Sequence, residues 1–159
     1  MRRDVVERAM VLGVATGLRS QTPIAVVAQV AQRHPTVVRR GSVAVRLREP
    51  RAAHFTGASA IGEMVADKLP FIPSRLTMPV LGGRILFGAL GGAAITPSAH
   101  PAWLGAAAGA VGAVAGNFGG YHARVWLGKR TGWPDPAFAL VEDTIAVTLS
   151  LWAARASVD

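Results

Sequence analysis

Apolar positions along this chain form long clusters separated by short polar stretches, and no cluster has a charged face at helical period. A helix needs about 20 residues to cross roughly 30 Å of hydrocarbon. Five stretches are apolar enough: residues 9–31, 52–69, 76–97, 104–123 and 136–154. We therefore predict an all-α fold, a polytopic membrane helical bundle of about five spans that forms a single transmembrane domain over residues 1–159. A soluble all-α bundle is the competing interpretation.

The composition favours the membrane interpretation. The chain is 51% hydrophobic and 16% charged, whereas ordinary soluble domains are about 25% charged. Because cysteine is absent, a disulfide framework and a thiolate metal site are excluded. The basic start followed by an apolar run resembles a signal peptide, but Arg19 interrupts the run and no convincing cleavage site follows. We expect this segment to be retained.

The segment 33–51 is too polar to cross a membrane. With a net charge of +8 a nucleic-acid partner has to be considered, but the segment lacks aromatic interleaving and any recognisable binding module. We expect no nucleic acid, and instead an interfacial loop that binds anionic lipid headgroups. The arginines expected to make these contacts are Arg39, Arg40, Arg46 and Arg48.

Glycines in the stretch 104–123 recur at a spacing of about four residues. In lipid, such small residues allow helix backbones to approach closely. Close packing inside the molecule is the main prediction, and a homodimer face is the alternative. The residues expected to mediate helix packing are Gly109, Gly112, Gly116 and Gly120.

Two pairs of segments indicate an internal repeat. GVATG (13–17) is similar to GAVAG (112–116), and IGEMVAD (61–67) is similar to LVEDTIA (140–146). If each pair of spans forms a unit, the single span between them forces the two units into opposite orientations. The pattern thus predicts two inverted helix-pair repeats around a central span.

Four acidic residues lie inside the predicted spans: Glu63, Asp67, Glu142 and Asp143. An ionised carboxylate at the bilayer centre costs about 2.5–3.5 kcal/mol, so such groups usually face a cavity or a partner. Glu63 and Asp67 are four residues apart and therefore share a helix face. Glu142 and Asp143 are adjacent and point in different directions, and we expect Glu142 to face the cavity.

Arg19 is the candidate counter-charge for these acids. It lies in GLRSQTP, where Pro23 lacks an amide hydrogen and frees a carbonyl near Arg19. Ser20 and Thr22 add hydroxyl groups. A broken helix is tolerated at membrane depth only if it is buried in protein or lines a cavity. We therefore predict a buried polar or ion site with walls formed by GLRSQTP, GEMVADK and LVEDT.

Five motifs of this chain carry a resemblance. They are TGLRSQTP (16–23), ASAIGEMVADKLPFIPSR (58–75), GGRILFGALGGA (82–93), GAVAGNFGGYHAR (112–124) and PDPAFALVEDTIAV (134–147). They resemble the motifs of a family of small bacterial integral-membrane proteins that is classed only as a domain of unknown function. The resemblance covers most of the chain outside the 33–51 loop. It implies a multi-pass helical protein of the bacterial inner (cytoplasmic) membrane and supplies no activity.

Two functions remain open at this point. The first is a small proton- or cation-coupled transporter or channel that uses the buried carboxylates. The second is a structural or accessory membrane subunit whose buried charges form a closed network of Arg19, Glu63 and Glu142, with a membrane protein as partner. We expect no enzymatic activity, no metal and no cofactor, because the four histidines lack metal-ligand spacing and no nucleophile motif is present.

Overall fold

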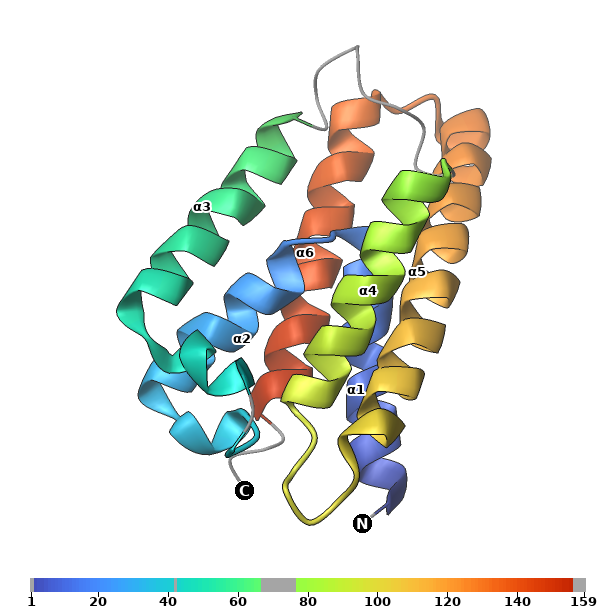
Figure 1. Ribbon diagram of the computed structural model, residues 1–159. Helices are drawn as coiled ribbons and strands as arrows, with labels where there is room; N and C mark the ends of the chain where they lie inside the picture. The colour runs from blue at the N-terminus through green and yellow to red at the C-terminus, as the bar shows by residue number, and fades with distance from the viewer. Residues whose placement is uncertain (1, 42, 67–76, 156–159) are drawn as a thin grey trace.

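The computed structural model describes residues 2–41, 43–66 and 77–155. These residues form six α-helices, two short 3₁₀ helices and no strand, which confirms the all-α class (Figure 1). The elements in chain order are α1 (Arg2–Leu18), α2 (Thr22–Arg33), η1 (Pro35–Val37), η2 (Val43–Arg48), α3 (Pro50–Ala66), α4 (Met78–Ala94), α5 (Ala102–Thr131) and α6 (Asp135–Arg155).

Proline and glycine mark several helix ends. Pro23 and Pro79 lie in the first turns of α2 and α4, where a missing amide hydrogen leaves no intrahelical bond unmade. Gly132 follows α5 with φ of 65°, and its amide donates to the carbonyl of Gly128 at 3.1 Å. This left-handed conformation is readily adopted by glycine and ends the helix.

The stretch 9–31 does not form the single span expected from its length. α1 ends at Leu18 and α2 begins at Thr22, because the ring of Pro23 would clash with the carbonyl of Arg19 in a continuous helix. After the break the chain reverses, and the Arg39 amide donates to the carbonyl of Ala94 at the end of α4, at 2.7 Å. The stretch 9–31 thus forms two helices separated at residues 19–21.

The start of α1 and the end of α6 lie at the same end of the bundle (Figure 1). The Arg8 guanidinium donates from Nε to the carbonyl of Ala153 at 3.1 Å. α2 returns the chain to this end, and the remaining helices alternate in direction. The described residues form six α-helices where the sequence predicts five spans, because the stretch 9–31 forms two of them.

One described helix is long and apolar enough to cross a membrane, judged by length and composition alone. This segment is Pro136–Arg155, with 20 residues, and 39% of its most apolar stretch is buried inside the molecule. The helix Met78–Ala94 is apolar but shorter. The other described helices do not pass this test: α1 to α4 have 12 to 17 residues. α5 has 30 residues and is long enough, but glycine and alanine give its uncharged stretch 104–123 a lower mean hydropathy.

Three helices pack backbone to backbone through a glycine seam. We use this name for the glycines whose added Cβ would collide with backbone of a neighbouring helix: Gly13, Gly17, Gly88, Gly92, Gly105, Gly109, Gly112 and Gly116. A Cβ at Gly109 would meet the Gly88 carbonyl of α4, and one at Gly116 would meet the Val14 carbonyl of α1. At Gly120 the obstacle is the Leu18 side chain, at 2.6 Å. These glycines therefore lie where neighbouring helices approach closely within one molecule.

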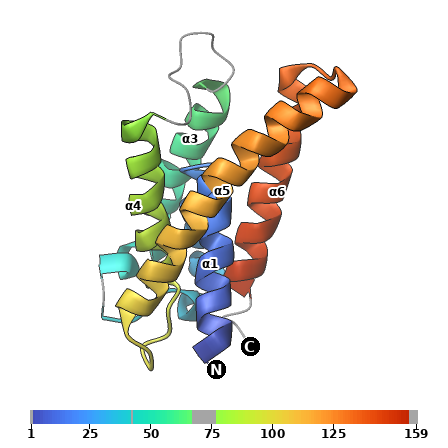
Figure 2. The same cartoon turned by 90° about the vertical axis from the view of Figure 1, so that its right-hand side faces the viewer.

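The glycine seam also shows the relative direction of α1 and α5. Gly112 is close to Met10, Gly116 to Val14, and Gly120 to Leu18. Residue numbers therefore rise together along both helices, which run parallel and side by side (Figure 2). An inverted repeat would place the GVATG and GAVAG segments in opposite directions. The structure gives no support for that repeat.

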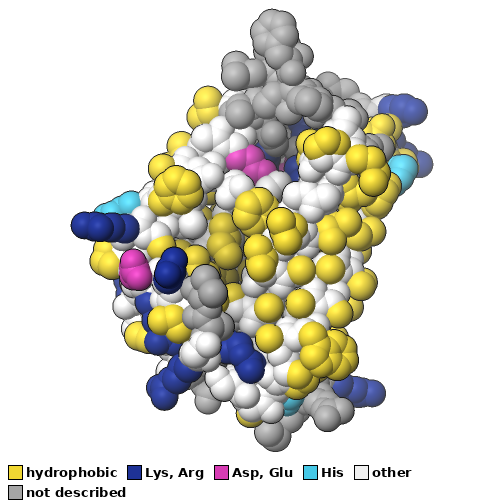
Figure 3. Space-filling view, viewed as in Figure 1, with side chains coloured by type: hydrophobic (Ala, Val, Ile, Leu, Met, Phe, Trp, Pro, Cys, Tyr) yellow, Lys and Arg dark blue, Asp and Glu magenta, His cyan; other side chains and the backbone are white. Residues whose placement is uncertain are grey.

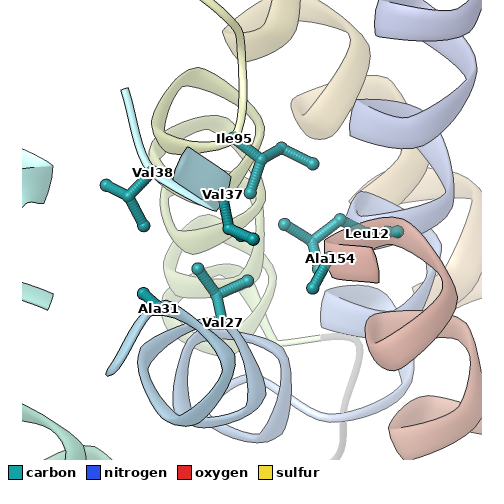
Figure 4. Close-up of a cluster of buried hydrophobic side chains, with 8 residues drawn as sticks. Leu12, Val27, Ala31, Val37, Val38, Ile95 and Ala154 are labelled. Atoms are coloured by element: carbon teal, nitrogen blue, oxygen red, sulfur yellow. The ribbon is translucent and has the colours of Figure 1, made fainter. Parts of the chain in front are cut away.

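An apolar cluster fills the space between α1, α2 and α6 (Figure 4). Its buried members are Leu12, Val27, Ala31, Val37, Val38, Ile95, Ala153 and Ala154. Val37 and Val38 come from the chain that follows α2, and each is 1% exposed. Through these two side chains the segment that follows α2 packs against the bundle.

Candidate functional site

Charged and polar side chains from four helices, α3 to α6, converge on the break between α1 and α2. We call this set the polar centre: Arg19, Ser20, Glu63, Arg84, Asn117, Arg124, Glu142 and Asp143. Arg19, Arg84 and Asn117 are at most 2% exposed. A break in a helix leaves amides and carbonyls without intrahelical partners, and the polar centre supplies those partners.

Glu63 binds the amides that the break exposes. Its two carboxylate oxygens accept hydrogen bonds from the backbone amides of Ser20 and Gln21, each at 2.8 Å. These amides lie at the start of α2, where the helix dipole also favours a negative charge. Glu63 comes from the last turn of α3, so a carboxylate of one helix caps the beginning of another.

Arg84 binds the carbonyl side of the same break. Its Nη1 donates to the carbonyl of Gly17 at 2.6 Å and to the Asn117 side-chain oxygen at 2.7 Å. Its Nε lies 3.3 Å from the Ser20 hydroxyl. Arg84 is on α4 and Asn117 on α5. The end of α1 is therefore connected to both helices through one guanidinium.

Arg19 itself is fully buried and faces α6. Its Nε is 2.5 Å from Oδ1 of Asp143, whose side chain is 14% exposed. A buried guanidinium requires such a partner because removal from water is expensive for an unpaired charge. Asp143 is therefore one partner of Arg19 on α6. The expectation that Glu142 also faces this site stays a prediction.

Glu142 is directed toward α5. Its Oε2 lies 3.4 Å from Nη1 of Arg124, and the two side chains are 10% and 19% exposed. Gly120 of α5 lies beside this carboxylate, since a Cβ there would be 3.7 Å from Oε1, an ordinary van der Waals contact. Within the described residues the polar centre thus contains three arginines and three carboxylates, so their formal charges cancel.

Two further residues predicted for the site, Thr22 and Asp67, are not among the residues of the polar centre. Thr22 is 2% exposed, and its hydroxyl has no hydrogen-bond partner in the described part of the chain. Asp67 lies outside the described residues. Arg84, Asn117 and Arg124 were not assigned to the site from the sequence. Arg84 had a visible signal, since it is the only charge in the stretch 76–97.

The basic loop uses two of its four predicted lipid-binding arginines inside the protein. Arg39 donates to the carbonyls of Pro97 and His100, at 3.0 and 2.7 Å. Arg48 donates to the carbonyl of Val38 at 2.7 Å. Arg40 and Arg46 are exposed. Arg39 therefore ties the loop to the segment between α4 and α5, whereas Arg48 closes a contact within the loop itself.

The described residues contain no group of three or more His, Cys, Asp or Glu placed to hold a metal ion. Carboxylates of the polar centre instead contact guanidinium groups or backbone amides. These contacts pair each carboxylate with an opposite charge or with backbone dipoles, which is how a buried charge is stabilised.

The fold and the site define an all-α protein in which helices from the whole chain surround a buried charged centre at a helix break. The chain belongs to the family described as Domain of unknown function (DUF4126), which it matches over residues 8–158. No match to a curated protein or to a solved structure was found. The family assignment agrees with the resemblance seen in the motifs.

Proposed function

We propose that this chain is a multi-pass protein of the bacterial inner (cytoplasmic) membrane. The proposal is supported by the distribution of polarity, since fully buried Arg19 contrasts with Phe55 at 77% exposure and Trp103 at 68%. Apolar side chains cover the middle of the face formed by α4 and α5, and Lys and Arg gather mainly toward its ends (Figure 3). An extensive apolar surface of this kind is unfavourable in water and favourable in lipid.

The tryptophans support the same placement. Trp103 lies near the start of α5 and Trp126 near its end, which corresponds to a rise of about 34 Å along the helix axis. This separation is close to the thickness of the hydrocarbon core, roughly 30 Å. Trp152, near the end of α6, lies at the same end of the bundle as Trp103, and Trp133 lies at the end of the bundle where α5 finishes. Both side chains are exposed. Tryptophan is enriched at membrane interfaces because its ring is amphipathic.

Within this membrane bundle the polar centre is the proposed path for protons, a cation or a small solute. The observation that carries this proposal is the broken helix, whose free amides are held by Glu63 and whose free carbonyl is held by Arg84. Discontinuous helices with charged or dipolar ends at membrane depth are a recurring design of transporter sites.

Proton binding would be coupled to movement through Glu63. An ionised carboxylate accepts both amides, whereas a protonated one loses its charge and part of its accepting capacity. α3 packs mainly against α2 and η2 at the edge of the bundle (Figure 1). Protonation of Glu63 therefore weakens the link between the end of α3 and the start of α2, and this opens the polar centre.

The test is proton flux in liposomes that carry a potassium diffusion potential and a trapped pH dye. The wild-type protein should acidify the interior, and Glu63→Gln should abolish the flux while the protein remains folded. Glu49→Gln, an exposed carboxylate at the start of α3, is the matched control and should conduct as the wild type does. Equal signals from the wild type, Glu63→Gln and empty liposomes would rule out proton conduction.

A second candidate is a structural or accessory membrane subunit. It is favoured by the cancelling charges of the described polar centre and by the use of Glu63 and Arg84 as backbone partners. In this case Glu63→Gln lowers stability without any flux to lose, and the protein co-purifies with a membrane partner. Flux and thermal stability measured on the same variants separate the two candidates.

A further inference from the structure

A groove of about 520 Å³ opens between the start of α1 and the start of α5, away from the polar centre. Its apolar walls are formed by Val6, Met10, Pro101, Trp103 and Leu104. This volume falls in the range of pockets that bury small organic ligands, about 300–1,000 Å³. Figure 2 shows the two helix starts close together near the N-terminus.

Two opposite charges line the same groove. Arg3 and Glu7 are four residues apart on α1 and therefore share one helix face. Both side chains are exposed, and neither forms an ion pair or hydrogen bond with a described residue. The groove consequently offers one cation and one anion, about one helical turn apart, beside an apolar surface.

We propose that this groove binds phosphatidylethanolamine, with the phosphate on Arg3, the ammonium on Glu7 and an acyl chain along the apolar wall. The inference rests on the proposed membrane placement, in which Trp103 marks the interface where headgroups lie. An anionic headgroup would meet repulsion from Glu7, and a choline headgroup has no N–H to donate to it. Paired opposite charges therefore select a zwitterionic amine lipid.

The test measures phospholipid binding to the full-length protein, purified from membranes in detergent and delipidated, by native mass spectrometry. Phosphatidylethanolamine should bind more tightly than phosphatidylcholine or phosphatidylglycerol. Arg3→Gln and Glu7→Gln should each raise its Kd about tenfold, the size expected for the loss of one charged hydrogen bond. Arg40→Gln and Glu49→Gln, which change exposed charges outside the groove, should leave it unchanged.

Two further results separate headgroup recognition from general damage. Glu7→Gln should increase the binding of phosphatidylglycerol, because the repulsion is removed, and misfolding would not do so. Val6→Trp fills the groove and should therefore weaken the binding of all three lipids to the same extent. Equal binding of the three lipids by the wild type, or an unchanged preference in Glu7→Gln, overturns the proposal.

Failure of this proposal is distinguishable from failure of the proposed function. Lipid binding in micelles requires no flux, so a protein that conducts no protons can still show the preference. If the protein is found in membranes and lacks the preference, only the lipid site is wrong. If it is not recovered from membranes, the membrane placement is wrong and the lipid site is wrong with it.

Discussion

The glycine seam and the polar centre connect helices by different means. In the seam, α1, α4 and α5 approach so closely that a Cβ at Gly109 would collide with the Gly88 carbonyl. In the polar centre, Arg19 and Asp143 connect α1 to α6, and Glu63 connects α3 to α2. Shape determines the first set of contacts, and charge determines the second.

The difference has a functional consequence. Close-packed backbones have little freedom to move, because any displacement creates collisions or voids. Charge pairs, in contrast, change their strength when a proton is gained or lost. We therefore expect the seam to form the static part of the molecule, and the side of the polar centre that faces α3 to form the responsive part.

The largest effect is expected from breaking the ion pair of Arg19. Asp143→Ala removes a carboxylate that contacts a fully buried guanidinium, and the free energy of unfolding should fall by about 3 kcal/mol. Thermal unfolding in detergent measures the change. The double variant Arg19→Met with Asp143→Leu should recover most of the loss, since apolar side chains can replace a buried pair. If the single variant is as stable as the wild type, the pair has no structural role.

A loss of similar size is expected in the glycine seam. Gly109→Ala introduces a Cβ against backbone atoms of Gly88 and should destabilise the protein by about 3 kcal/mol, at the upper end of typical overpacking effects. Gly119→Ala lies on the same helix, where a Cβ meets no atom within 4 Å. This control should be neutral or slightly stabilising, because alanine favours helix. Similar melting temperatures for the two variants would contradict the close packing.

Glu63→Gln should have an intermediate effect on stability. The amide keeps one good acceptor oxygen for the backbone of Ser20 or Gln21 and loses the charge, so we expect a loss of about 2 kcal/mol. The measurement is the melting temperature, compared with that of Glu49→Gln. A loss well beyond this size, together with absent flux in the wild type, would favour the structural candidate over the transporter.

The smallest effect is expected at an exposed pair outside both regions. The Arg130 guanidinium lies 4.7 Å from the ring centroid of Trp126 near the end of α5. Arg130→Gln removes this cation–π contact and should lower the free energy of unfolding by only about 0.5–1 kcal/mol. Thermal unfolding measures this loss, which should be smaller than the losses of the variants in the glycine seam and in the polar centre. A larger loss would show that the end of α5 is more tightly integrated than its exposure indicates.

The helical stretches and the break were accessible from the sequence because their causes are local. Pro23 prevents a continuous helix over residues 9–31 wherever the neighbouring helices lie. The glycine spacing in residues 104–123 likewise indicates close packing, because a smooth helix face follows from the spacing itself. The direction of the chain after the break is not determined locally, since it depends on the packing of Val37 and Val38 in the apolar cluster.

The sequence by itself determined that this chain is helical, that one helix is broken near Arg19 and that glycines mediate close packing. Only the tertiary structure decided the partners: Asp143 for Arg19, the Gly17 carbonyl for Arg84 and two backbone amides for Glu63. The physical reason is that helix propensity, proline geometry and residue size act over a few neighbouring residues. The partner of a buried charge depends on which distant helix is packed beside it.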